Sequence, residues 1–149
     1  MPSPPPFYSQ ETDNSCVPAC LRMILEANGR EFPEAELRRL CECEEDGTPP
    51  SKALQAAEQL GFTQSRHGNL EIDELQVELA RGLYPIAFVE IKAGIFRGKH
   101  AVVVIEIANN KVKLLDPLMR REQDGRRELA LEDFQRMWAA KGNQTLLVE

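Results

Sequence analysis

The stretch HAVVVIEIANNKVKLLD, residues 100–116, decides the fold. Residues 100–107 form a nearly continuous apolar run, which is too short for most helices and is typical of a buried central strand. Residues 111–116 follow a turn at 108–110, where asparagine tolerates the left-handed conformation that a hairpin turn needs. This stretch therefore predicts a β-hairpin at the centre of a sheet.

Helical spacing dominates before this hairpin. Ser15 or Asn14 can cap the first helix, and Pro18 is tolerated only in a first helical turn. Asn28-Gly29 then gives a stop signal. We expect helices over residues 16–28, 33–43, 51–61, 72–81 and 131–140, and strands over residues 84–91, 100–107, 111–116 and 144–148. This order predicts an α+β fold, with an N-terminal helical half packed on a C-terminal, mostly antiparallel sheet.

The composition describes one globular domain over residues 1–149, with residues 1–9 as a proline-rich, extended lead-in. The net charge of −6 argues against nucleic acid as the main partner. It also disfavours a strongly acidic substrate, although a charge of this size is too small to decide that question. No apolar run approaches the ~20 residues that span a bilayer. The N-terminus also lacks the basic start and apolar stretch of a secretory signal, so we expect a cytoplasmic protein.

Four cysteines stand at positions 16, 20, 41 and 43. In a reducing compartment, reactive or structural thiols are favoured over disulfides. Their spacing lacks the paired ligands of a zinc site, so no metal is expected. Cys16 begins the first helix, where the helix dipole stabilises a thiolate, and it is the candidate nucleophile. The alternative is a small buried hydrophobic residue, the role that we assign to Cys20.

His100 begins the central strand, beside a polar loop at residues 93–99 that could form one wall of a cleft. This position suits a general base, and an ordinary edge histidine is the alternative. With a three-residue turn at 108–110, Asp116 opposes Val102 on the face of His100 and can orient its imidazole. A two-residue turn would move Asp116 to the other face. The alternative for Asp116-Pro117 is a strand-ending turn.

Two further polar residues lie in loops. Gln10 precedes Cys16 by six residues, and its side-chain amide can donate a hydrogen bond to a developing oxyanion. The alternative is a solvated loop glutamine. His67 has no acidic or thiol neighbour in its loop, so we expect it at the surface.

The order and spacing of Gln10, Cys16, His100 and Asp116 resemble the C39 family of papain-like cysteine peptidases. The residues that carry the resemblance are 10–23 (QETDNSCVPACLRM), 98–104 (GKHAVVV) and 114–117 (LLDP). Residues 52–62 look like the middle helix of that family, and residues 134–148 look like its closing helix and strand. The resemblance thus covers nearly the whole chain.

The resemblance implies a papain-like fold with a cleft between a helical half and a sheet half, a peptide or protein substrate, and no cofactor. Cys16 would be the nucleophile, with His100 as base and then acid. Asp116 would orient His100, and Gln10 with the Cys16 N–H would bind the oxyanion. Many family members cleave a leader peptide after two small residues, often Gly-Gly, during bacterial bacteriocin export. Those members are usually fused to a membrane transporter. Because the 149 residues of this chain are too few to include one, we expect a stand-alone member.

Two positions depart from the family pattern. Val17 stands where the family usually has glycine after the nucleophile, and Lys99 separates Gly98 from His100. Val17 motivates an alternative hypothesis, a peptide-binding module on the same fold that has lost turnover. A third hypothesis is transfer of the acyl group to an amine or thiol, which shares its first half-reaction with hydrolysis.

Overall fold

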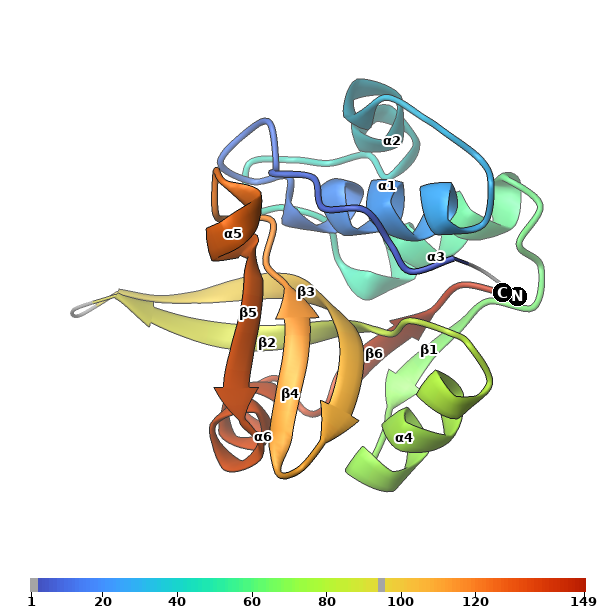
Figure 1. Cartoon of the computed structure of the whole chain (residues 1–149). Helices are drawn as coiled ribbons and strands as arrows, with labels where there is room; N and C mark the ends of the chain where they lie inside the picture. The colour runs from blue at the N-terminus through green and yellow to red at the C-terminus, as the bar shows by residue number, and fades with distance from the viewer. Residues whose placement is uncertain (1–2, 94–95) are drawn as a thin grey trace.

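The computed structural model describes residues 3–93 and 96–149. Its helices are α1 (Cys16–Ala27), α2 (Glu34–Leu40), α3 (Pro50–Gln59), α4 (Ile72–Ala80), α5 (Glu122–Gly125) and α6 (Leu131–Ala139). Its strands are β1 (Arg66–Asn69), β2 (Ile86–Ala93), β3 (Phe96–Ala108), β4 (Lys111–Leu115), β5 (Arg126–Ala130) and β6 (Gln144–Leu147) (Figure 1). Within the described ranges, no helix has the length and apolar character needed to cross a bilayer.

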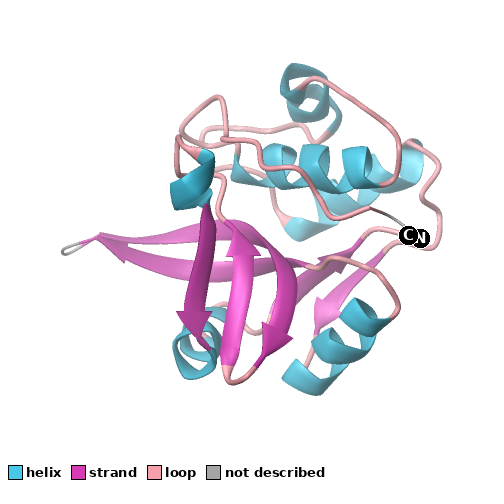
Figure 2. Ribbon diagram, in the orientation of Figure 1, coloured by secondary structure: helices cyan, strands magenta, loops and turns pink. Residues whose placement is uncertain are grey.

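One sheet joins the strands in the order β1-β6-β2-β3-β4-β5, and every neighbouring pair is antiparallel. The sheet lies between two helical layers (Figure 2). Ala101 and Val103 of β3 join the core cluster shared with α1 and α3, whereas Val102 and Val104 join the cluster around Phe134 and Trp138 of α6. The apolar run in β3 is thus buried on both faces, and the predicted α+β class is confirmed.

The arrangement of helices differs from the expected simple helical half. Figure 1 shows α1, α2 and α3 on one side of the sheet and α4 with α6 on the other. Leu75 of α4 belongs to the core cluster of α6, because the central strands expose apolar residues on both faces and need two covers. The α4 helix is therefore separated from the other early helices by the sheet.

Several elements were absent from the expectation. β1 is short and polar, and it forms the sheet edge by pairing with β6. His67 lies on this strand rather than in a loop, although it is exposed as predicted. α5 and β5 occupy a charged segment without an apolar periodicity, and β5 pairs along the length of β4. The second predicted helix also ends earlier, at Leu40, before Glu42 adopts a φ of 51°.

The β3–β4 hairpin corrects the expected turn. Its turn has two residues, Asn109 and Asn110, with φ values of 55° and 61°. The prediction of a three-residue turn is therefore wrong. However, a bulge between Val104 and Glu106 adds one residue to β3 and restores the register, so that Val103 opposes Leu115. Asp116, the next residue, consequently comes beside Val102 for a different reason from the one expected.

The polar loop expected at residues 93–99 is also corrected. β2 and β3 form one long hairpin in which Ala93 pairs with Phe96 and Glu90 with Lys99. Gly94 lies outside the described residues. Strand pairing satisfies the backbone here regardless of side-chain polarity, so polar composition alone indicated a loop where a hairpin stands.

The proline-rich lead-in lies along α1. The backbone N–H of Ser3 donates to Ala27 O at 2.9 Å, and Tyr8 Oη donates to Glu26 at 2.6 Å. The Arg22 guanidinium stacks 3.8 Å from the centre of the Tyr8 ring. These contacts attach the first residues to α1, and Phe7 and Tyr8 pack against the core cluster.

Candidate active site

Cys16 is the first residue of α1 and is half-buried. Cys20, one helical turn later, is fully buried, and burial raises its pKa well above the usual value. Burial likewise raises the pKa of Cys41 to about 12. Both of these thiols are therefore unreactive core residues, which agrees with the structural role expected for Cys20. Cys16 stands at the mouth of the helix, where first-turn N–H groups favour negative charge.

His100 and Asp116 form a buried pair, with Nε2 of His100 2.6 Å from Oδ1 of Asp116. The same carboxylate accepts the backbone N–H of Leu118 at 3.0 Å and the Arg127 guanidinium at 2.8 Å. Burial alone would raise the pKa of Asp116, but hydrogen bonds from His100, the Leu118 N–H and Arg127, together with the charge of His100, hold it below 3.8. Asp116 is therefore ionised at neutral pH and fixed from three sides.

His100 stands between Asp116 and Cys16. Burial lowers the pKa of His100, but its hydrogen bonds with Asp116 and Cys16, together with the charges of those two groups, raise it from 6.5 to about 9. The ring is therefore an imidazolium at neutral pH, and it lies within hydrogen-bonding reach of the Cys16 side chain. A cation at this place stabilises negative charge on the sulfur. The three residues come from α1, β3 and the end of β4.

Gln10 lies next to the Asp116–Pro117 corner, where its backbone N–H donates to Pro117 O at 2.8 Å. Its side-chain Nε2 donates to Thr12 O at 2.8 Å, within the same loop. One amide hydrogen is thus used by the loop, and the second stays available to another acceptor. The fold brings Gln10 into the neighbourhood of the other three residues, with its side chain tied to its own loop.

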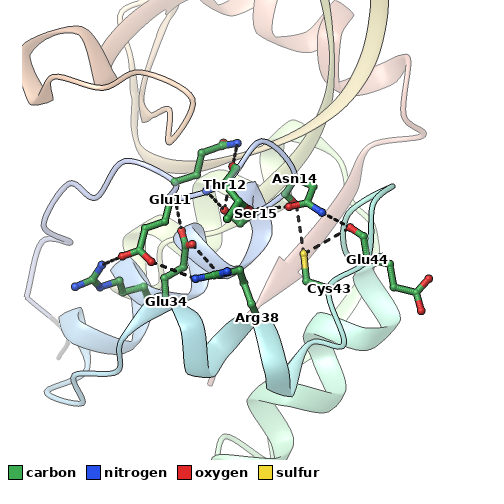
Figure 3. A network of polar contacts seen from close by, with 10 residues as sticks. Glu11, Thr12, Asn14, Ser15, Glu34, Arg38, Cys43 and Glu44 are labelled. Atoms are coloured by element: carbon green, nitrogen blue, oxygen red, sulfur yellow. Dashed lines mark hydrogen bonds and ion pairs between the residues drawn. The ribbon is translucent and has the colours of Figure 1, made fainter.

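A second polar network holds the loop that leads into α1 (Figure 3). Glu34 of α2 is 1% exposed, and its Oε1 accepts the backbone N–H of Glu11 at 3.0 Å. Within the loop, Ser15 Oγ accepts the N–H of Thr12 at 3.0 Å and donates to Thr12 O at 3.1 Å. The loop is therefore fixed both at its middle and immediately before the candidate nucleophile.

Arg38 supplies the counter-charge of Glu34. Its Nε lies 3.2 Å from Glu34 Oε2, although the two atoms are not aligned as a hydrogen bond. Burial raises the pKa of Glu34, and the N–H of Glu11 and the Ser15 hydroxyl partly offset that rise. Glu34 is thus a buried carboxyl group that contacts the backbone of the loop.

We expect Glu34→Ala to lower the free energy of unfolding by about 2 kcal/mol, because the Glu11 N–H loses its acceptor. We also expect alkylation of Cys16 to slow by about tenfold, since the loop before it loosens. Glu34→Gln keeps an acceptor oxygen and should retain most of the stability and most of the alkylation rate of the wild type. Urea unfolding and iodoacetamide labelling measure the two effects, with Glu36→Ala as control, because the half-buried Glu36 pairs with Arg39 on the same helix. Unchanged labelling in Glu34→Ala would limit the network to a structural role.

Sequence reasoning missed Arg127 and Glu34. Arg127 opposes Leu114 in the β4–β5 register, in a strand whose charged sequence gives no apolar signal. Glu34 stands at the start of a helix, where acidic residues are common because they complement the helix dipole. Neither residue carries a local signal that distinguishes a partner of the site from an ordinary surface charge.

Comparison with known proteins gives a family match over most of the chain. The model of the Peptidase C39 family matches residues 5–148. No curated protein matches the chain.

Solved structures give the same assignment at the level of the fold. The peptidase domain of Streptococcus ComA, a bi-functional ABC transporter involved in quorum sensing, is 24% identical, with 95% of this chain and 96% of that chain covered at a TM-score of 0.74. A C39-like peptidase from Bacillus anthracis is 16% identical over 97% of this chain and 94% of its own, with a TM-score of 0.79. A double glycine motif protease from an AMS/PCAT transporter, in complex with the leader peptide, is 19% identical over 99% of this chain and 94% of its own, with a TM-score of 0.76. These likenesses confirm the papain-like peptidase fold.

Proposed function

We propose that this chain, which belongs to the Peptidase C39 family, hydrolyses peptide bonds as a cysteine peptidase with Cys16 as nucleophile. The observation that carries the proposal is the His100 imidazole, paired with Asp116 at 2.6 Å and within hydrogen-bonding reach of Cys16. The proposal treats residues 1–149 as one peptidase domain without a cofactor. It also places the protein in a reducing compartment such as the cytoplasm, since oxidation of Cys16 would stop the reaction.

The proposed reaction begins when the Cys16 sulfur attacks the carbonyl carbon of the substrate and forms a tetrahedral oxyanion. The intermediate collapses, the C–N bond breaks, and the His100 imidazolium gives its proton to the leaving amine. Water then attacks the thioester while neutral His100 accepts its proton. Release of the carboxylic acid restores the thiolate and imidazolium. Asp116 keeps the ring oriented and stabilises its charged form.

The oxyanion requires hydrogen-bond donors at the position where its charge develops. The backbone N–H of Cys16 belongs to the first turn of α1, so it has no acceptor within the helix. We assign the second donor to Gln10, through the amide hydrogen that does not bind Thr12. Both donors come from the loop and helix that Glu34 holds in place.

For the substrate, we propose a peptide of the leader-peptide class. The similar double glycine motif protease is solved in complex with a leader peptide, and the likeness to it covers 99% of this chain. We extend that substrate class to this chain as part of the proposal, with small residues at the cleaved bond.

Iodoacetamide labelling tests whether the proposed pair is assembled. We expect Cys16 to react at least about tenfold faster than half-buried Cys43, because only Cys16 stands beside an imidazolium and a helix N-terminus. His100→Ala should remove most of this advantage while leaving Cys43 unchanged. Peptide mapping by mass spectrometry reports each thiol separately. Equal rates for Cys16 and Cys43, with no effect of His100→Ala, would contradict the proposal.

A peptide library then tests turnover. We expect cleavage products from the wild-type protein and none from Cys16→Ala. Tight retention of a peptide without cleavage, identical in both proteins, would indicate a binding module instead. Ligated product on addition of an amine would indicate acyl transfer.

A further inference from the structure

A cavity of about 360 Å³ lies beside His100. Pro50, Phe88 and Val89 give it an apolar floor, and His67, Lys99 and Lys141 contribute its ionisable side chains besides His100. It lies between the start of α3 and the strands β1, β2 and β3. A cavity that shares a wall with His100 is within reach of a substrate bound at the proposed site.

The cavity opens where the strand pairing of the sheet changes. β6 pairs with β2 at Ile86 and Ala87, and in the described part of the chain this pairing stops there. The next residue of β6, Gln144, pairs with Asn69 of β1, which lies on the other side of β6. From Phe88 onward, the edge of β2 therefore faces the cavity rather than another strand. This hollow is consequently built by the sheet topology and does not depend on one mobile side chain.

The charges at this cavity are of one sign, against the acidic balance of the chain. Among the described residues that line it, none is acidic, whereas Lys99 and Lys141 are both cationic. Glu90 lies directly opposite Lys99 in the strand register, and its Oε2 is 3.8 Å from Lys141 Nζ. That distance exceeds a hydrogen bond, so the Lys141 ammonium keeps its donors for another acceptor. One carboxylate also leaves at least one of the two lysine charges without compensation.

We propose that this cavity is a specificity pocket for an acidic side chain, glutamate above aspartate, of a substrate residue within two positions of the cleaved bond. The inference rests on the proposed peptidase function and names its substrate more closely. The methylene groups of glutamate would pack on Pro50 and Phe88, and its carboxylate would bind Lys141 and Lys99. A pair of glycines has no side chain to occupy the cavity. The glutamate therefore occupies a position next to the small residues proposed at the cleaved bond, and is not one of them.

The test uses short internally quenched peptides whose cleaved bond has been located by mass spectrometry. Glutamate, glutamine or lysine is placed in turn at each of the two positions on either side of that bond. We expect one position at which glutamate exceeds glutamine by about tenfold in kcat/KM, because a charge-assisted hydrogen bond replaces a neutral one. In Lys141→Glu, the order of the glutamate and lysine peptides should invert at that position. Equal rates for all three peptides, or a preference for glutamine, would overturn the inference.

Lys111→Glu is the matched control, because Lys111 lies on β4 outside this cavity and makes its ion pair with Glu128. Lys111→Glu changes the net charge by the same amount as Lys141→Glu, but the preference for glutamate should persist in it. Binding of the same peptides to Cys16→Ala, measured by fluorescence polarisation, separates this inference from the proposed function. A glutamate preference in binding without cleavage by the wild type would reject the peptidase and keep the pocket. Cleavage without preference, unaffected by Lys141→Glu, would keep the peptidase and reject the pocket.

Discussion

Asp116→Ala is expected to slow cleavage of the best peptide by about a hundredfold, and alkylation of Cys16 by about tenfold. The substitution removes the acceptor that lies 2.6 Å from His100 Nε2, so the buried ring loses both its orientation and its counter-charge. It also leaves the Arg127 guanidinium without the partner that now lies at 2.8 Å. Second-order rates of inactivation by iodoacetamide measure the effect even before a substrate is known. Rates within twofold of the wild type would contradict the assigned role.

Asp116→Asn separates orientation from charge. Its Oδ1 can still accept the hydrogen bond of the ring, so we expect a smaller loss of rate than in Asp116→Ala. The negative charge is lost, however, and burial alone lowers the pKa of His100. The pKa of His100 should therefore fall from about 9 toward 6.5, because Cys16 still raises it but the Asp116 charge no longer does.

The charge on His100 can be followed directly. Iodoacetate is an anion that an imidazolium attracts, whereas iodoacetamide is neutral. The rate of Cys16 alkylation by iodoacetate, divided by its rate with iodoacetamide, therefore reports the charge of the ring. In the wild type this ratio should fall as the pH rises through about 9, and in Asp116→Asn it should fall at lower pH. The chain has two histidines, so a proton NMR titration with His100→Ala as reference assigns the same transition independently. A wild-type midpoint near 6.5 would contradict the ion pair.

The same pair makes stability depend on pH. Because folding raises the pKa of His100 from 6.5 to about 9, its stabilisation is fully present below pH 6.5 and is lost as the pH rises through about 9. Folding lowers the pKa of Asp116, so the contribution of Asp116 to stability is present above pH 3.8 and is lost as the pH falls below that value. The two shifts describe one interaction and are not added together.

The sequence predicted which residues form this site, but it did not predict how the strands bring them together. Cys16 could be placed at a helix start because Pro18 restricts where that helix begins. The position of Asp116 could not be derived, because it depends on a bulge near Ile105 that compensates a two-residue turn. Side-chain alternation alone gives no signal for one extra residue in a strand that is apolar on both faces.

Residues that support the site were beyond sequence reasoning for a related reason. Arg127 and Glu34 act through contacts between segments that are distant in the chain, with Arg127 reaching Asp116 from β5 and Glu34 reaching Glu11 from α2. Each is one charged residue among many, and only the sheet order and the packing of α2 select it. The cavity beside His100 depends in the same way on β1, a polar strand of four residues without an apolar pattern.

Gly125→Ala is expected to lower the free energy of unfolding by about 3 kcal/mol, through steric conflict with the lead-in. A Cβ atom at Gly125 would lie 2.0 Å from Cε1 of Phe7, closer than any carbon contact allows. The backbone O of Gly125 accepts the N–H of Asp116 at 2.8 Å, so movement of this segment also disturbs the carboxylate that holds His100. We therefore expect slower alkylation of Cys16 together with the loss of stability.

A double-mutant cycle identifies the cause. Phe7→Ala removes the ring, so adding Gly125→Ala to it should cost much less than adding it to the wild type, and the difference measures the contact between lead-in and α5. Gly68→Ala is the matched control, because no atom lies within 4 Å of the added Cβ. Urea unfolding and iodoacetamide labelling of the set report stability and site geometry separately. If Gly125→Ala behaves like Gly68→Ala in both measurements, Phe7 does not pack on α5 in solution, and the lead-in contributes nothing to the position of Asp116.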